Sequence, residues 1–336
     1  MLVLLWAIVP GCRKHSGDGA PPSATSASET PASSARPGVA SIAEAMAAAD
    51  LRVEAKRGTT NAFEPLTEKH RAELEAHFKG PVPFPLAYQV VAVGSGRRAV
   101  LFQATEGEAR PLVWLLDGDE NILWAKERPT GGVKPGVTEI SLASGPDGHV
   151  CLAWCNAATD SVALRRWADD GGAFADYEVV HVDTCSALSL IYWPSRGWVV
   201  AVAWPGGASF ELISENGALS WGREGVSLPW TFLAAAPVSL ALDTIDSVMF
   251  FRLGQSSGPT SVEYLFATRF SAEGRPLWPG PLSLKRLDRP VADPATRVLV
   301  TPGPEGSIRA ALLRSATQGD AEVVVDVASD GTVLRH

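Results

Sequence analysis

The sequence predicts an all-β protein, a β-propeller of about five four-stranded blades, preceded by a disordered spacer and a short helical lead. Two turn signatures that recur together lead to this prediction. A Gly or Asp opens five β-rich runs, and 20 to 28 residues later an acidic or polar residue with Gly precedes an apolar or Trp position. Successive copies of the second signature lie 46 to 57 residues apart, a pitch typical of a four-stranded propeller blade.

Both signatures have a physical reason. The residues that open the β-rich runs are Gly96, Gly148, Gly197, Asp246 and Gly306. The second signature runs from Asn121 to Trp124, Gly171 to Phe174, Gly217 to Trp221, Gly274 to Trp278 and Gly331 to Leu334. Glycine adopts positive φ without a Cβ penalty and so marks hairpin turns, and Asn121 is the residue expected to replace it in the first repeat. Trp at equivalent places predicts packing between blades rather than ligand stacking.

The N-terminus predicts export. The nine apolar residues Leu2–Pro10 are too few to cross a bilayer core, which needs about 20, but they fit the apolar region of a signal peptide. The sequence Val-Pro-Gly-Cys at 9–12 resembles the lipobox of bacterial lipoproteins, in which the Cys becomes diacylated. The resemblance implies a signal peptide over 1–12 and lipid on Cys12; the alternative is an unmodified Cys in a frayed terminus. Arg13 in place of Asp implies the outer membrane, facing the periplasm or the cell surface.

Two segments precede the repeats. Residues 13–40 are rich in Ser, Ala and Pro and cannot offset the entropy of folding, which predicts a disordered spacer. Residues 41–86 form the helical lead, with helices expected at Ile42–Lys56 and Leu66–Lys79. We expect this lead to pack on the propeller or to serve as a short contact element.

The propeller is assigned to residues 87–336, with four short strands in each repeat. The fourth strands are expected at 122–128, 174–180, 219–224, 276–284 and 332–336. Because the chain ends on a fourth strand, no strand exchange closes the ring, and either the lead or face-to-face packing must do so. A sixth, degenerate blade is the alternative. The longer connections cluster on one rim, where we expect function to lie: 157–161, 254–260, 286–296 and 315–321.

Composition and motifs exclude several functions. The net charge of −8 offers no basic footprint for nucleic acid. Asp117, Asp119 and Asn121 have the spacing that opens a calcium loop, but Ile122 and Arg128 replace its Gly and Glu, so an acidic hairpin turn is the better interpretation. The histidines lack metal-ligand spacing, and no cofactor motif is present in the sequence, so neither a metal site nor a cofactor is predicted.

The remaining cysteines predict one disulfide. Exported proteins meet oxidising conditions, and three cysteines remain after Cys12. Cys155 ends a second strand and Cys185 precedes the next first strand, so propeller topology brings both to the same rim. Cys151 lies roughly 13 Å back along its strand at about 3.3 Å per residue. We therefore expect a Cys155–Cys185 bridge with Cys151 reduced and buried; three buried free thiols is the alternative.

The repeats resemble, over residues 88–336, the blades of quinoprotein-like and WD-type propeller proteins, and this resemblance implies the fold only. Our first functional hypothesis is a membrane-anchored, noncatalytic binding or assembly module without catalytic residues, whose partner on the long-loop rim is a protein or a glycan. The alternative is a secreted propeller hydrolase acting on glycans. For that alternative Asp243, Asp246 and Glu139 are the candidate carboxylates.

Overall fold

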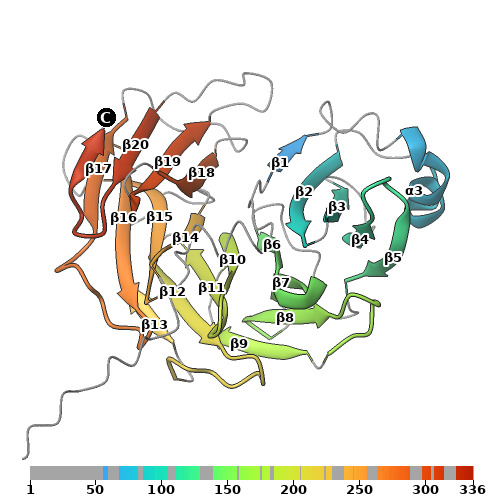
Figure 1. The fold of residues 1–336 in the computed structure, drawn as a ribbon, viewed down its shortest axis with the longest axis horizontal. Coiled ribbons are helices and arrows are strands. Elements are labelled where there is room, and N and C mark those ends of the chain that lie inside the picture. The colour runs from blue at the N-terminus through green and yellow to red at the C-terminus, as the bar shows by residue number, and fades with distance from the viewer. Residues whose placement is uncertain are drawn as a thin grey trace, which may run out of the picture. The chain divides into compact units, whose positions relative to one another are not determined.

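Five antiparallel sheets of consecutive strands form the part of the chain described by the computed structural model (Figure 1). The described residues are 56–59, 68–81, 86–94, 96–104, 110–128, 139–156, 159–174, 176–181, 185–204, 206–222, 225–228, 238–244, 246–255, 263–287, 297–303, 306–313 and 323–335. All of them belong to a unit that spans residues 40–336.

Each sheet is a meander in which neighbouring strands follow one another in sequence. The first sheet contains β1 (Lys56–Thr59), β2 (Leu86–Val93), β3 (Arg97–Ala104), β4 (Leu112–Leu116) and β5 (Ile122–Glu127). The second contains β6 (Ile140–Ser144), β7 (Val150–Asn156), β8 (Ser161–Trp167) and β9 (Tyr177–His181). The third contains β10 (Ala187–Trp193), β11 (Gly197–Trp204), β12 (Gly207–Ile213) and β13 (Val226–Leu228). The fourth contains β14 (Val238–Thr244), β15 (Ser247–Gln255), β16 (Glu263–Ser271) and β17 (Leu282–Arg286), and the fifth β18 (Arg297–Pro302), β19 (Ile308–Leu313), β20 (Val323–Val327) and β21 (Val333–Arg335).

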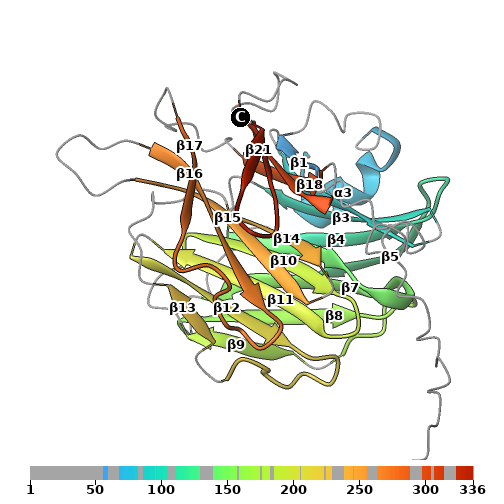
Figure 2. The same ribbon diagram turned by 60° about the vertical axis from the view of Figure 1, so that its left-hand side comes forward.

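The sheets pack face to face in chain order, so the predicted propeller of about five blades is confirmed. The inner strand of each sheet contacts that of the next: β2 with β6, β6 with β10, β10 with β14, and β14 with β18. Alternate side chains of each sheet face opposite neighbours, as the two-residue period of a strand requires. In Figure 2 the third sheet (yellow) lies along the second (green), and β12 contacts β9.

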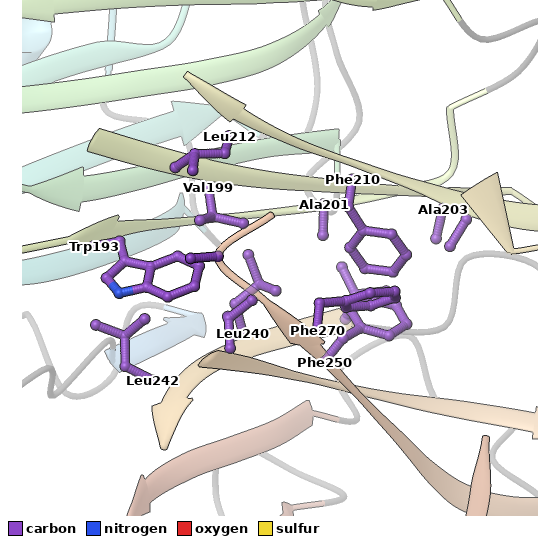
Figure 3. Close-up of a cluster of buried hydrophobic side chains, with 14 of the residues drawn as sticks. Trp193, Val199, Ala201, Ala203, Phe210, Leu212, Leu240, Leu242, Phe250 and Phe270 are labelled. Atoms are coloured by element: carbon purple, nitrogen blue, oxygen red, sulfur yellow. The ribbon is translucent and has the colours of Figure 1, made fainter. Parts of the chain in front are cut away.

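Four buried hydrophobic clusters join the first sheet to the second, the second to the third, the third to the fourth and the fourth to the fifth. The cluster between the third and fourth sheets is the one drawn in Figure 3, where Phe210 points toward Phe250 and Phe270. The ring centroid of Phe210 lies 4.6 Å from that of Phe250 and 4.8 Å from that of Phe270. Such continuous burial across neighbouring sheets supplies the main stabilising free energy of the fold.

A helix covers the remaining face of the first sheet. Helix α3 (Arg71–Phe78) places Leu74, which is fully buried, in a cluster with Val100, Phe102 and Trp114. Within the described part of the chain, this fifth cluster contains no side chain of the fifth sheet. The lead therefore packs on the propeller, and α3 covers the face that a fifth sheet would contact in a ring closed by face-to-face packing.

The lead also contains a strand that the sequence did not predict. β1 pairs antiparallel with β2, Lys56 lying opposite Val90 and Thr59 opposite Ala87. The expected helix over Ile42–Lys56 therefore does not include Lys56, and the rest of it lies outside the described residues, as does the expected spacer. A free hydrogen-bonding edge on β2, rather than local propensity, accounts for this strand.

The third sheet differs from the prediction at its outer edge. The fourth strand expected over 219–224 is reduced to a single bridge between Ile213 and Leu219, and the regular strand β13 starts later, at Val226. The second and fourth sheets have the same arrangement, since isolated bridges at Ala173 and Pro276 precede their regular fourth strands. In the third sheet the carboxylate of Glu211 accepts hydrogen bonds from the backbone N–H groups of Leu212 and Trp221, both at 2.9 Å, and so binds the segment between the bridge and β13. Gly222, with φ of 96°, continues this bulge.

Candidate functional site between the second and third sheets

The recurring tryptophans hold neighbouring sheets together. The candidate site lies at the one interface of the described sheets where another residue takes the place of this Trp. In the first, third and fourth sheets a Trp side-chain Nε1 donates to a backbone carbonyl in the turn of the next sheet. The three bonds are Trp124 to Asp169 at 3.0 Å, Trp221 to Ala272 at 2.8 Å, and Trp278 to Ser329 at 3.2 Å. The prediction that these tryptophans pack between blades is therefore correct.

The second sheet has no Trp at this place, and Phe174 is not its equivalent. Phe174 stands three residues after the turn residue Gly171, whereas Trp221 and Trp278 stand four residues after Gly217 and Gly274. The position three residues after the turn is exposed elsewhere as well, with Leu277 43% and Leu334 49% accessible. The second turn signature therefore aligned Phe174 and Leu334 with the tryptophans, although both stand one position closer to the turn than Trp221 and Trp278 do.

An arginine makes the contact with the next sheet instead. Arg166 on β8 is buried, and its Nη2 donates to the Glu215 carbonyl at 2.8 Å, in the turn where a Trp would bind. Its Nη1 donates to Oε2 of Glu215 at 3.1 Å, and Nη2 also reaches the Tyr177 hydroxyl at 3.2 Å. Tyr177 fills the space against the turn, since a Cβ on Gly217 would lie 2.0 Å from its ring. A guanidinium therefore replaces the indole N–H as the donor to the carbonyl of the next turn, and it adds an ion pair with Glu215.

Aromatic rings surround this guanidinium. The Arg166 Cζ lies 4.8 Å from the ring centroid of Phe174 and 5.6 Å from that of Tyr177, both within the range of cation–π attraction. His149 packs edge-on against Phe174 with centroids 5.2 Å apart. Phe174 nevertheless keeps 37% of its surface accessible, and the Glu215 side chain keeps 46%. We call His149, Arg166, Phe174, Tyr177 and Glu215 the Phe174 platform.

The electrostatics of the platform extend into the protein interior. Burial raises the pKa of the Cys151 thiol well above its usual value, with Glu215 adding to the rise and Arg166 opposing it. Burial, followed by a hydrogen bond to Glu215, raises the pKa of the Tyr192 phenol. Among the described residues, two buried nitrogens of the platform, Arg166 Nε and His149 Nδ1, find no hydrogen-bond partner. Buried polar atoms without partners are uncommon and often mark a place where water or a ligand supplies the missing bond.

The structure joins Cys155 and Cys185 in a disulfide between the same two sheets. Their Cα atoms are 6.0 Å apart, within the range that a bridge requires, and Cys151 is a buried free thiol. This covalent link joins the two sheets at whose interface Arg166, and not a Trp Nε1, donates to the next turn.

The carboxylates proposed for hydrolysis lie in different sheets. Glu139 directly precedes β6, while Asp243 lies on β14, two sheets further on. Asp246 accepts a hydrogen bond from Arg196 Nη2 at 2.8 Å, an arrangement that neutralises the carboxylate instead of preparing it for acid–base chemistry. Glu211, which the sequence analysis missed, is fully buried, and desolvation raises its pKa to about 7.

The acidic turn of the first sheet is a hairpin, as the sequence predicts. The Asp117 carboxylate accepts hydrogen bonds from the backbone of Asp119 and Asn121 and from the Asn121 side chain, and these bonds lower its pKa. The residue with positive φ is Glu120, at 66°, and not Asn121. In the described ranges no group of three or more His, Cys, Asp or Glu residues is placed to hold a metal ion.

Two predicted regions cannot be placed in the fold. Cys12 lies outside the described residues, as do most residues of the long-loop rim where the sequence analysis expected function. The Phe174 platform instead lies at the short turns, because Glu215 belongs to the turn between β12 and the bridge at Leu219. No helix in the described part of the chain has the length and apolar character of a membrane span.

Comparison with known proteins gives structural likeness alone. No family model and no curated protein matches the sequence. Among solved structures, the BP39L lectin from Burkholderia pseudomallei has a TM-score of 0.46 at 11% identity, covering 74% of this chain and 88% of the lectin. An α-L-arabinofuranosidase from Clostridium thermocellum has a TM-score of 0.41 at 11% identity, covering 78% and 96%. The β-propeller domain of the Trilobed protease from Pyrococcus furiosus has a TM-score of 0.38 at 9% identity, covering 71% and 81%. These likenesses concern the fold and carry no functional argument.

Proposed function

We propose that this protein is a noncatalytic binding module, held at the outer membrane by lipid on Cys12, that contacts its partner through the Phe174 platform. The observation that carries the proposal is the accessible ring of Phe174, which packs against the buried and hydrogen-bonded guanidinium of Arg166. Aromatic and Arg side chains with this support dominate binding free energy at recognition sites, because they are rigid and partly desolvated before the partner arrives.

The chemistry of the platform suits binding better than catalysis. Arg166 and Glu215 form a closed ion pair, and the guanidinium also bonds a backbone carbonyl and a phenol. A carboxylate oxygen that already accepts a hydrogen bond from a guanidinium is poorly placed to take a proton from a substrate. Of the carboxylates proposed for the hydrolase alternative, Asp246 is paired with Arg196.

A photo-crosslinking experiment in intact cells tests the contact. We replace Phe174 with p-benzoylphenylalanine in the full chain and use the same replacement at Leu277, the exposed equivalent in the fourth sheet, as the control. Benzophenone reacts with C–H bonds of any bound macromolecule. We expect a crosslinked product at position 174 and little at 277. Absence of a product at 174, or equal products at both positions, would contradict the proposal.

Fractionation tests the anchor separately. The wild-type chain is expected in the membrane fraction, and Cys12→Ser is expected in the soluble fraction because an unlipidated chain loses the acyl groups that hold it. A soluble wild-type protein that retains Met1 would show that the lipoprotein assignment is wrong.

A further inference from the structure

The charge balance and shape of the Phe174 platform define a class of ligand. We propose that the platform binds a neutral saccharide, with one sugar ring stacked on Phe174. This inference rests on the proposed function and adds the chemistry of the partner to it.

The exposed ring provides an apolar surface of limited size. Phe174 remains 37% accessible although Arg166 and His149 both pack against it. A stable protein interface buries about 800 Å² on each partner. The platform instead offers one aromatic ring with a carboxylate and an imidazole at its border, which matches one or two sugar rings. The C–H face of a sugar ring packs on such an aromatic surface without needing charge.

The charges disfavour ionic ligands. The Arg166 guanidinium already lies 4.8 Å from the Phe174 ring centroid, so a cation stacked on the same ring would face a like charge. The Glu215 carboxylate is paired with this guanidinium, so an anion finds no uncompensated positive charge on the platform, in a protein whose net charge is −8. Since like charges brought together at an interface are strongly disfavoured, an uncharged ligand is the one that fits.

Hydrogen-bonding capacity remains for hydroxyl groups. The accessible Glu215 side chain accepts hydrogen bonds, and His149 borders the same ring. Hydroxyls donate as well as accept, so a polyhydroxylated ring can donate to the accessible Glu215 carboxylate, directly or through water.

Isothermal titration calorimetry of the folded protein tests the ligand class. The probes are neutral gluco-, manno-, galacto- and xylo-hexaoses, with oligogalacturonate as the anionic probe and chitosan hexaose as the cationic probe. We expect at least one neutral hexaose to bind and the charged probes to bind at least tenfold more weakly. Phe174→Ala should weaken neutral binding at least tenfold, whereas Leu277→Ala, at the equivalent exposed position, should leave it unchanged. Phe174→Ala also removes the packing against Arg166 and His149, so thermal unfolding of both variants is measured to show that each is folded at the titration temperature.

The outcomes separate this inference from the proposed function. Tight binding of a charged probe, or neutral binding that is insensitive to Phe174→Ala, would overturn the saccharide assignment. A protein crosslinked at position 174 together with no binding of any hexaose would also overturn it, while leaving the binding module intact. A missing crosslink at 174 would contradict the proposed function itself.

Discussion

At the scale of single residues, the turn glycines have two separate roles that the structure distinguishes. Gly96 and Gly274 share a φ of 74°, a conformation that side chains with a Cβ rarely adopt. A Cβ on Gly96 would meet open space, whereas one on Gly274 would lie 2.8 Å from Cγ of Trp221. The first glycine serves backbone geometry alone, and the second also leaves room for the Trp of the preceding sheet.

This difference predicts a matched pair of stabilities. Gly96→Ala should lower the free energy of unfolding by about 1 to 2 kcal/mol, the cost of the left-handed backbone. Gly274→Ala should lower the free energy of unfolding by about 1 to 3 kcal/mol more than Gly96→Ala does, because the new Cβ must displace the packed Trp221 ring. Urea unfolding of both variants measures the difference. Equal losses would mean that Trp221 does not press on the turn.

Glu211 predicts a dependence of stability on pH. The pKa of its carboxyl is raised from 4.5 to about 7 by burial, so the folded state holds the proton more tightly than the unfolded chain. The contribution of Glu211 to the free energy of unfolding is therefore greatest below pH 4.5 and falls as the pH rises to 7. Above pH 7 this contribution is smaller by about 3 kcal/mol.

Glu211→Gln should remove this slope, because the amide keeps the oxygen that accepts from Leu212 and Trp221 but cannot ionise. Chemical unfolding between pH 5 and pH 8 measures it, with the exposed turn residue Glu273→Gln as the control. If wild type and Glu211→Gln lose stability in parallel over this range, then Glu211 is not the responsible group.

At the scale of structural elements, neighbouring sheets are joined by contacts that differ in kind. Three interfaces use a Trp that donates to the next turn. At the interface between the second and third sheets Arg166 donates to the next turn instead. The Cys155–Cys185 disulfide of this interface belongs to its apolar cluster.

We expect non-reducing peptide mapping to find Cys155 linked to Cys185, with Cys151 alkylated only after denaturation because it is buried. The bridge spans 30 residues and should contribute about 3 to 4 kcal/mol through loop closure in the unfolded chain. The free energy of unfolding of Cys155→Ala/Cys185→Ala, compared with wild type, checks this value. A bridge that contains Cys151 would contradict the pairing and the packing of these two sheets.

At the scale of the whole molecule, the first sheet is capped by the lead. Lys69 Nζ donates to the Asp119 carbonyl at 2.6 Å and the His70 ring lies 2.8 Å from the Glu120 carbonyl, in the turn that a preceding blade would contact. Helix α3 buries the sheet face beside this turn. The lead therefore performs the function that terminal capping repeats perform in repeat proteins.

Leu74→Ala should accordingly lower the free energy of unfolding of the whole unit by about 2 to 5 kcal/mol, although the residue lies outside every blade. Glu73→Ala on the exposed face of the same helix is the control and should change stability by less than about 0.5 kcal/mol. Global unfolding followed by fluorescence and circular dichroism measures both. If Leu74→Ala unfolds like wild type, α3 is not an integral part of the propeller.

The sequence alone determined the features that depend on the local backbone. The β-rich runs, the turn glycines and the approximate 50-residue pitch specify meanders of four strands, because strand propensity and positive φ act within a few residues. These local signals also predicted the acidic hairpin at Asp117. They failed where a distant group overrides propensity, as in β1, which pairs with β2. They also missed that a single bridge precedes the regular fourth strand in the second, third and fourth sheets.

Only the tertiary structure decided how the sheets contact one another. Arg166 meets Glu215 across 49 residues of sequence, and Trp221 meets Ala272 across 51. The spacing from the turn glycine separates the exposed Phe174 from the partly buried Trp221, but what each side chain contacts depends on the neighbouring sheet. The candidate site arises from that long-range packing, and the signal in the sequence that could have indicated it is the missing Trp in the second repeat.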